Sequence, residues 1–119
     1  AGSAARREAL EQRGIEVVVL EPAAGRVSLE LLIQELGRRQ YQSAMIEAGS
    51  KLNGAAFDAG VVDKILFYYA PKILGGLHSL PVAGGVGRQR RVDAILLEDL
   101  RLHPVAPEEF AVEAWVKKN

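Results

Sequence analysis

Cysteine is absent from this chain of 119 residues. Its absence excludes disulfide bonds and thiolate metal ligands, and it is compatible with a reducing compartment. An excess of charge of either sign is lacking as well, because fifteen basic residues balance fifteen acidic ones. The composition therefore gives no argument for a nucleic acid or an anionic membrane surface as a partner. We expect any anion-binding site to be local.

Long apolar runs are also lacking. No stretch approaches the roughly 20 apolar residues that a membrane-spanning helix needs. Charges stand at Arg6, Arg7 and Glu8, where a signal peptide would need an apolar run. The sequence predicts a cytoplasmic protein with no membrane association.

Histidine is scarce, and its spacing indicates neither a metal site nor a catalytic triad. His78 and His103 lie far apart and show no metal-ligand spacing with carboxylates. Neither accompanies a serine or cysteine in the context of a nucleophile. We predict no metal, and we assign no catalytic residue.

What is present indicates a globular α/β domain. Hydrophobic residues make up 49% of the chain and charged residues 25%, and the length suffices for one compact domain with a core. Apolar periodicity and glycine or proline boundaries predict helices over 4–13, 29–39 and 51–59, and strands over 15–20, 43–47, 62–70, 92–103 and 109–117.

This order predicts βαβαβ followed by ββ, a mixed sheet of about five strands flanked by helices. Residues 72–87 are glycine-rich and predict a long irregular loop. The turn-forming Pro104-Val105-Ala106-Pro107 separates the last two strands, which we expect to pair antiparallel. An α/β domain rarely opens at the tail of a helix, so we expect further sequence upstream of this chain.

The most informative segment spans residues 45–54. A predicted strand ends at the carboxylate of Glu47, the chain turns on Ala48-Gly49-Ser50, and a helix rich in small residues follows. Backbone N–H groups at the positive end of a helix form a ready anion site, and open α/β sheets bind phosphates at such turns. We therefore expect a phosphate or diphosphate site here.

The expected donors are the backbone N–H groups that open the helix, those of Ser50, Lys51, Leu52 and Asn53. Gly49 would allow close approach of the backbone to a ligand. Glu47 would stand beside that ligand and accept a hydrogen bond from a substrate amine or hydroxyl. The alternative is that Ser50 is an ordinary N-cap and Glu47 an ordinary charge at a strand end.

The basic run Arg88-Gln89-Arg90-Arg91 is a second candidate anion site, for instance for a 2′-phosphate. A solvated loop edge leading into a strand is the favoured interpretation. Tyr68 and Tyr69 adjoin in one strand and face opposite sides of the sheet, and Trp115 lies in the last strand. We expect packing or interface roles for these aromatics, and an exposed boundary charge at Asp63.

The middle of the chain resembles a known family. Ile46-Glu47-Ala48-Gly49, then Leu52, then the run from Ala59 to Gly75 follow the pattern of the reductase domain of the bifunctional riboflavin-biosynthesis deaminase/reductase. That pattern reads Glu-(Gly or Ala)-Gly, a helix of small residues, Gly-Leu-Val-Asp, a strand and Ala-Pro-Lys-Leu-Leu-Gly. About thirty residues match in order, which is far more specific than a glycine turn alone.

The resemblance implies a partial dihydrofolate-reductase-like fold, NADPH as cofactor, and reduction of the ribosyl group of 5-amino-6-(5-phosphoribosylamino)uracil to the ribitylamino product. By motif position, Glu47 corresponds to the substrate-contacting glutamate of the family. The positions that correspond to its NADP-binding turn and helix start are Gly49, Ser50, Lys51, Leu52, Asn53, Gly54 and Ala55. Ala48 replaces the glycine that many members carry, and its methyl group should leave backbone N–H donation intact.

The chain is shorter than a full reductase domain of that family. The resemblance therefore implies that residues 1–119 are the carboxy-terminal part of such a domain, inactive alone and prone to form homo-oligomers. Two alternatives remain: a reductase of the same fold acting on another pteridine- or folate-like substrate, and a non-catalytic oligomerisation or ligand-binding module.

Overall fold

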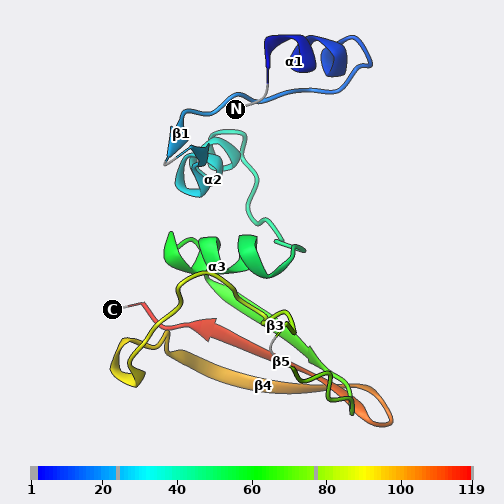
Figure 1. Cartoon of the computed structure of the whole chain (residues 1–119), viewed down its shortest axis with the longest axis vertical. Coiled ribbons are helices and arrows are strands. Elements are labelled where there is room, and N and C mark those ends of the chain that lie inside the picture. Colours follow the sequence, from blue (N-terminus) through cyan, green and yellow to red (C-terminus); the bar gives the residue numbers. More distant parts are fainter. Residues whose placement is uncertain (1–2, 24, 77, 119) are drawn as a thin grey trace. The chain divides into compact units, whose positions relative to one another are not determined.

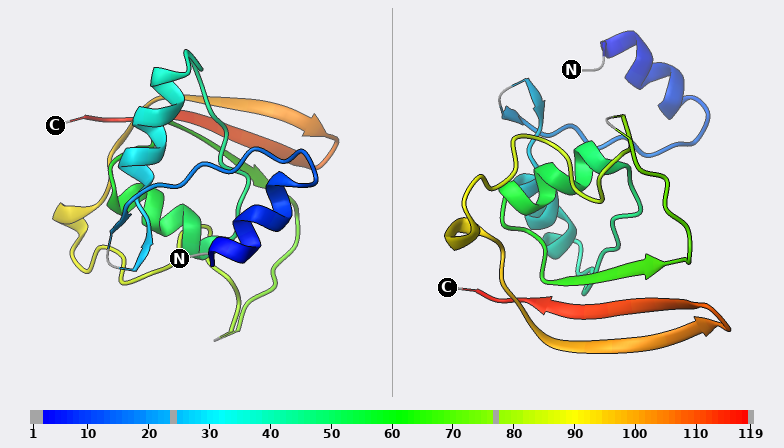
Figure 2. Two further views of the ribbon diagram at one scale, coloured as in Figure 1. Left: turned by 90° about the horizontal axis from the view of Figure 1, so that it is seen from above. Right: turned by 60° about the horizontal axis from the view of Figure 1, so that its bottom comes forward.

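The computed structural model describes residues 3–23, 25–76 and 78–118. The chain divides into two compact units, Ala1–Met45 and Ile46–Asn119. Figure 1 labels the helices and strands of each unit, and Figure 2 gives two further views. The candidate turn belongs to the second unit.

The first unit contains two helices and a small hairpin. Helix α1 (Ala4–Glu11) is followed by β1 (Pro22–Ala23), β2 (Arg26–Val27) and α2 (Leu29–Arg38), with β1 and β2 antiparallel. Gly14 follows α1 with φ +75°, a left-handed conformation that favours glycine at a helix end. Helix α2 begins after Ser28, whose hydroxyl oxygen accepts a hydrogen bond from the Leu31 N–H at 3.1 Å. Both predicted helices are confirmed.

The strands predicted over 15–20 and 43–47 are not formed, and this part of the prediction is wrong. Both segments have irregular backbone. Their composition favours strands, but a strand completes its hydrogen bonds only on a neighbouring strand. In the ranges that the structure describes, no strand pairs with either segment. The sheet that does form is therefore antiparallel.

The second unit is built on a three-stranded antiparallel sheet. It contains α3 (Ser50–Asp58), β3 (Lys64–Tyr69), the short 3-10 helix η1 (Arg91–Asp93), β4 (Leu97–Ala106) and β5 (Glu109–Val116). The strand order is β3-β5-β4. In Figure 1 and in the right-hand view of Figure 2, α3 lies next to β3, and β4 is the strand farthest from it.

The β4–β5 hairpin confirms the predicted antiparallel pairing but shifts its turn. Pro104 pairs with Phe110 inside the ladder, and the turn consists of Pro107 and Glu108. Proline is tolerated here because β4 is an edge strand, where a missing N–H breaks no ladder bond. The ladder register shifts between Pro104 and Ala106.

The buried core consists of small side chains. Among the described residues, the buried hydrophobic ones are Ala56, Ile65, Ala111 and Ala114. Ile65 pairs with Ala114 across β3 and β5. The extensive core expected from the length is not formed, because many large apolar side chains remain exposed, including Ile73 and Leu74 at 98% and 93%.

Candidate functional site

The candidate turn opens α3, and Gly49 rather than Ser50 occupies the N-cap position. Gly49 has extended backbone (φ −76°, ψ 168°), and no side chain caps the helix there. Ser50 is the first helical residue, so the alternative of an ordinary serine cap is wrong. A glycine cap leaves the first amides without a side-chain acceptor.

The set of free donors is smaller than the sequence predicts. The Gly49 carbonyl oxygen accepts hydrogen bonds from the N–H groups of Leu52 at 3.0 Å and Asn53 at 3.2 Å. The prediction that these two amides are free is therefore wrong, because the helix closes its first turn on the capping carbonyl. In the part of the chain that the structure describes, the amides of Ser50 and Lys51 have no acceptor.

Two charged side chains stand near these amides in sequence. Lys51 is exposed and, within the described residues, makes no ion pair, so its ammonium group adds positive charge at the positive helix end. Glu47 is exposed in the irregular segment that precedes α3. It does not end a strand, contrary to prediction, because residues 43–47 have no strand partner. Its carboxylate makes no hydrogen bond or ion pair to a described residue.

The second half of the predicted cofactor turn contacts residues 82–88 of the same unit. The Asn53 side-chain amide donates to the Val82 carbonyl oxygen at 2.9 Å. Gly54 is buried against Gly84, and Ala55 is half-buried. The backbone N–H groups that remain accessible to a ligand are thus those of Ser50 and Lys51, at the beginning of the turn.

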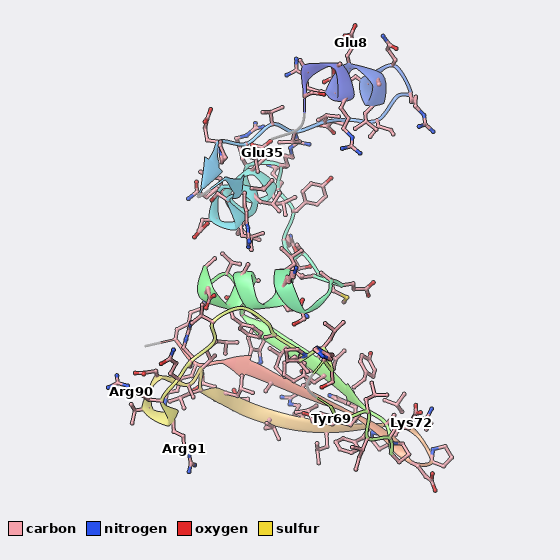
Figure 3. All side chains as sticks on the ribbon, viewed as in Figure 1. Glu8, Glu35, Tyr69, Lys72, Arg90 and Arg91 are labelled. Carbon is pink, nitrogen blue, oxygen red and sulfur yellow. The ribbon has the colours of Figure 1, made fainter. Side chains whose placement is uncertain are left out.

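The arginines of the basic run have partners of their own. Arg88 donates to Asp58 at 2.6 Å, at the last residue of α3. That residue lies about 12 Å along the helix axis from Ser50. Arg90 donates two hydrogen bonds to Asp93, at 2.7 and 2.8 Å, and they lower the pKa of the Asp93 carboxyl. Figure 3 shows Arg90 and Arg91 projecting from the η1 turn, away from the sheet. This geometry favours the solvated loop edge over a second anion site.

A network of charged residues on the outer face of the sheet was not predicted. Glu113 accepts from Lys64 at 2.9 Å, and His103 Nε2 lies 3.3 Å from Glu113. Lys64 also lies 4.7 Å from the Trp115 ring centroid. The Lys64 hydrogen bond is the main cause that lowers the pKa of Glu113. Only strand register could have revealed this network, because Lys64 of β3 and His103 of β4 reach Glu113 of β5 from opposite neighbouring strands.

The aromatic and boundary residues take local roles. Tyr69 stacks on Phe110 with ring centroids 5.0 Å apart and planes 12° apart, and Figure 3 places Tyr69 at the end of the sheet opposite Arg90. Tyr68 is exposed. Asp63 is paired with Lys118 at 2.5 Å, as a boundary charge would be.

Two shallow hollows lie elsewhere in the described part of the chain, away from the turn. One of about 470 Å³ is lined by Leu102, Pro104 and Phe110, among others, near the tip of the hairpin. The other, of about 380 Å³, lies between residues 19–21 and α2. In the described ranges, no group of three or more acidic or histidine side chains is arranged to hold a metal ion, and no helix is long and apolar enough to cross a membrane.

The fold corresponds to that of a known class of proteins. The structure matches the chain of a RibD from Acinetobacter baumannii with a TM-score of 0.77 and 21% identity, over 94% of this chain and 29% of that one. The helices and the antiparallel sheet thus form part of a dihydrofolate-reductase-like fold.

Comparison of sequences is more specific. The profile of the family described as the RibD C-terminal domain matches residues 3–109, and the chain belongs to this family. The chain is 38% identical over 85 residues to the riboflavin biosynthesis protein RibD of Actinobacillus pleuropneumoniae, covering 71% of this chain and 23% of that protein. It is 36% identical over 102 residues to the 2,5-diamino-6-ribosylamino-4(3H)-pyrimidinone 5′-phosphate reductase of Methanothermobacter thermautotrophicus, covering 86% of this chain and 46% of that protein. The chain thus spans less than half the length of either relative.

Proposed function

We propose that this chain is part of an NADPH-dependent reductase of riboflavin biosynthesis. Its substrate would be 5-amino-6-(5-phosphoribosylamino)uracil, whose ribosyl group is reduced to the ribitylamino product. Family membership supports the reductase class, as does the reductase name of the archaeal relative. The observation that carries the proposal is the family motif at residues 46–75. It includes the start of α3, where the amides of Ser50 and Lys51 have no acceptor among the described residues.

The residues at this helix start suit a diphosphate. The Ser50 and Lys51 amides offer two donors at a positive helix end, and the Lys51 ammonium adds a full positive charge. Gly49 has no Cβ to limit approach, and a Cβ built there would meet nothing within 4 Å. A dinucleotide diphosphate carries about two negative charges, which this arrangement would neutralise in part. The proposed cofactor-binding segment is Gly49 to Ala55.

The residues of the chain would bind and orient the reactants. When bound, the nicotinamide cofactor supplies the hydride. The turn at residues 49–55 would hold the cofactor by its phosphates. Glu47 would accept a hydrogen bond from an amine or hydroxyl of the substrate and so fix the carbon that receives the hydride. We assign no proton donor among the described residues.

The test is an NADPH titration of the full-length gene product followed by amide NMR. We expect the Ser50 and Lys51 amide signals to shift most, because their N–H groups have no acceptor among the residues that the structure describes. Lys51→Ala should weaken NADPH binding about three- to tenfold, as expected for the loss of one charged contact at a helix end. The matched control, Lys117→Ala, removes an exposed lysine that directly follows β5 and should leave NADPH binding unchanged. Unperturbed amides throughout residues 49–55 would exclude the cofactor assignment.

A second substrate is supported by a specific observation. The archaeal relative is named for 2,5-diamino-6-ribosylamino-4(3H)-pyrimidinone 5′-phosphate, and it aligns with 86% of this chain. Parallel kcat/KM measurements on that compound and on the uracil compound separate the two substrates. A higher value for the diaminopyrimidinone would replace the proposed substrate while keeping the reductase class.

A further inference from the structure

A glycine-rich segment runs alongside α3 and is bonded to it at both ends. We call residues 82–88 the glycine strap; they contain Gly84, Gly85 and Gly87. At one end, the Val82 carbonyl oxygen accepts from the Asn53 side chain at 2.9 Å. At the other end, Arg88 donates to Asp58 at 2.6 Å. Figure 1 and the right-hand view of Figure 2 show this segment, in yellow-green, running alongside α3.

The strap approaches the helix more closely than any side chain would allow. A Cβ atom at Gly54 would lie 1.9 Å from the Gly84 carbonyl oxygen. Gly54 is buried by this contact. Glycine at position 54 is therefore required by the strap, independently of any ligand, because a methyl group would push the Gly84 peptide away.

The middle of the strap bonds to the peptide group that carries a free donor. The Gly84 N–H donates to the Ser50 carbonyl oxygen at 2.8 Å. That carbonyl belongs to the same peptide unit as the Lys51 N–H, one of the two amides without an acceptor. A hydrogen bond to a peptide oxygen polarises the unit, fixes its plane and strengthens donation by its N–H. Because the C=O and N–H of a trans peptide point in opposite directions, the strap bonds this peptide from the side opposite to the phosphate that the Lys51 N–H would bind.

We propose that the glycine strap is a positioning element for cofactor phosphates. Gly84 orients and polarises the Ser50–Lys51 peptide, and the Asn53 and Arg88 contacts hold Gly84 in place. This inference rests on the proposed function, since it assumes that the turn binds the NADPH diphosphate. Neither Gly84 nor Arg88 touches the ligand in this arrangement; both act through α3.

The test uses Arg88→Gln and Gly84→Val in the full-length gene product. Arg88→Gln releases one end of the strap, and Gly84→Val adds a branched side chain where even a Cβ would lie 2.6 Å from the Ser50 hydroxyl oxygen. The matched control is Arg90→Gln, because Arg90 pairs with Asp93 only three residues away and not with α3. If Gly84→Val fails to fold, Arg88→Gln alone carries the test.

We expect both strap variants to raise the KM for NADPH about five- to tenfold, the size of one weakened hydrogen bond to a charged ligand. The kcat and the KM for the pyrimidine substrate should stay within about twofold, and Arg90→Gln should change none of these values. ADP, which keeps the diphosphate, should lose inhibitory strength in parallel with NADPH. Combining Asp58→Arg with Arg88→Asp should restore the KM for NADPH by re-forming the pair in reverse.

An equal rise in the KM values of both reactants, or no rise for NADPH, would overturn the positioning role while leaving the proposed function in place. Failure of the wild-type protein to bind NADPH would overturn both. A KM rise without a parallel change in ADP inhibition would also contradict the proposal, because the effect would then lie outside the phosphates.

Discussion

Glu47 and Lys51 illustrate how much depends on single side chains near the start of α3. Lys51 offers positive charge to an anion, whereas the exposed Glu47 carboxylate makes no hydrogen bond or ion pair with a described residue. An exposed carboxylate that bonds to no described residue contributes little to stability. The proposed role of Glu47 is therefore separable from stability.

Replacing Glu47 with Gln should affect the substrate more than the cofactor. We expect kcat/KM for the pyrimidine substrate to fall about ten- to a hundredfold, because a charged acceptor is lost. The Kd for NADPH should change less than about twofold. Steady-state kinetics and NADPH fluorescence titration measure the two effects, with the exposed Glu8→Gln as control. Equal losses for both ligands would indicate a structural role instead.

Glu35 has the largest pKa displacement among the described groups. Its carboxylate accepts two hydrogen bonds from Arg38, at 2.8 and 2.7 Å, and one from Arg39 at 2.6 Å. The Arg38 bonds first, and then the Arg39 bond, lower the pKa of Glu35 from the ordinary 4.5 to about 2. Arg39 also pairs with Glu16 at 2.6 Å, which ties the segment after α1 to α2.

We expect the contribution of Glu35 to the free energy of unfolding to change with pH between about 4.5 and 2. Because its folded pKa lies below its unfolded value, the contribution is fully present above about pH 4.5 and is lost as the pH falls toward 2. A carbon-detected NMR titration of the Glu35 carboxyl should give a midpoint near 2. Arg38→Gln should move that midpoint upward more than Arg39→Gln does. A midpoint near 4.5 in the unmodified protein would contradict the ion pairs.

At the scale of elements, α2 shows how a cap defines a helix. Ser28 is 7% exposed, accepts from the Leu31 N–H at 3.1 Å and donates to the Glu30 carboxylate at 2.8 Å. The hydrophobic spacing of the helix and the serine before it were both readable from the sequence. Both ends of the helix were accordingly predicted to within one residue.

Removing this cap should destabilise the protein measurably. Ser28→Ala should lower the free energy of unfolding by about 1 kcal/mol, because the Leu31 N–H would lose its acceptor at a helix end. Urea denaturation followed by circular dichroism measures the change. The control is Ser43→Ala, an exposed serine in irregular backbone, which should fall within about 0.5 kcal/mol of the wild type. A Ser28→Ala variant as stable as the control would refute the capping role.

The strands show which predictions from the sequence succeed and which fail. The predicted strands at 62–70 and 109–117 correspond to β3 and β5, because these two segments pair with each other. Residues 15–20 have the same β-branched character but no partner strand among the described residues. Pro104 was taken as a turn residue and instead lies in β4, because an edge strand tolerates a missing N–H.

At the scale of the whole molecule, many large apolar side chains are exposed to solvent. The free ladder edge of β4 carries Leu100 and Leu102, which are 59% and 64% exposed. Unpaired strand edges with apolar side chains associate readily. This surface agrees with the expectation that the chain forms homo-oligomers, which stays a prediction.

We expect the isolated 119-residue polypeptide to self-associate and to lack reductase activity. Size-exclusion chromatography with light scattering should give a mass above 12.9 kDa. Leu102→Lys should reduce the association, because it places a charge on the β4 edge. Val92→Lys, at an exposed position in η1, serves as the control and should leave the association unchanged. A monomer, or NADPH-dependent turnover by the isolated chain, would contradict the respective half of this prediction.

The sequence by itself determined the helices, the antiparallel hairpin and the family, because each depends on residues close together in the chain or on a motif in fixed order. It also located the turn at residues 47–55. Only the tertiary structure decided which amides of that turn are free, and it assigned Gly54 to a contact with Gly84. The free amides follow from the Gly49 carbonyl bonding Leu52 and Asn53. The contact between Gly54 and Gly84 joins residues thirty positions apart, which no local pattern specifies. The strands at 15–20 and 43–47 failed for the same reason, since a strand exists only beside another strand.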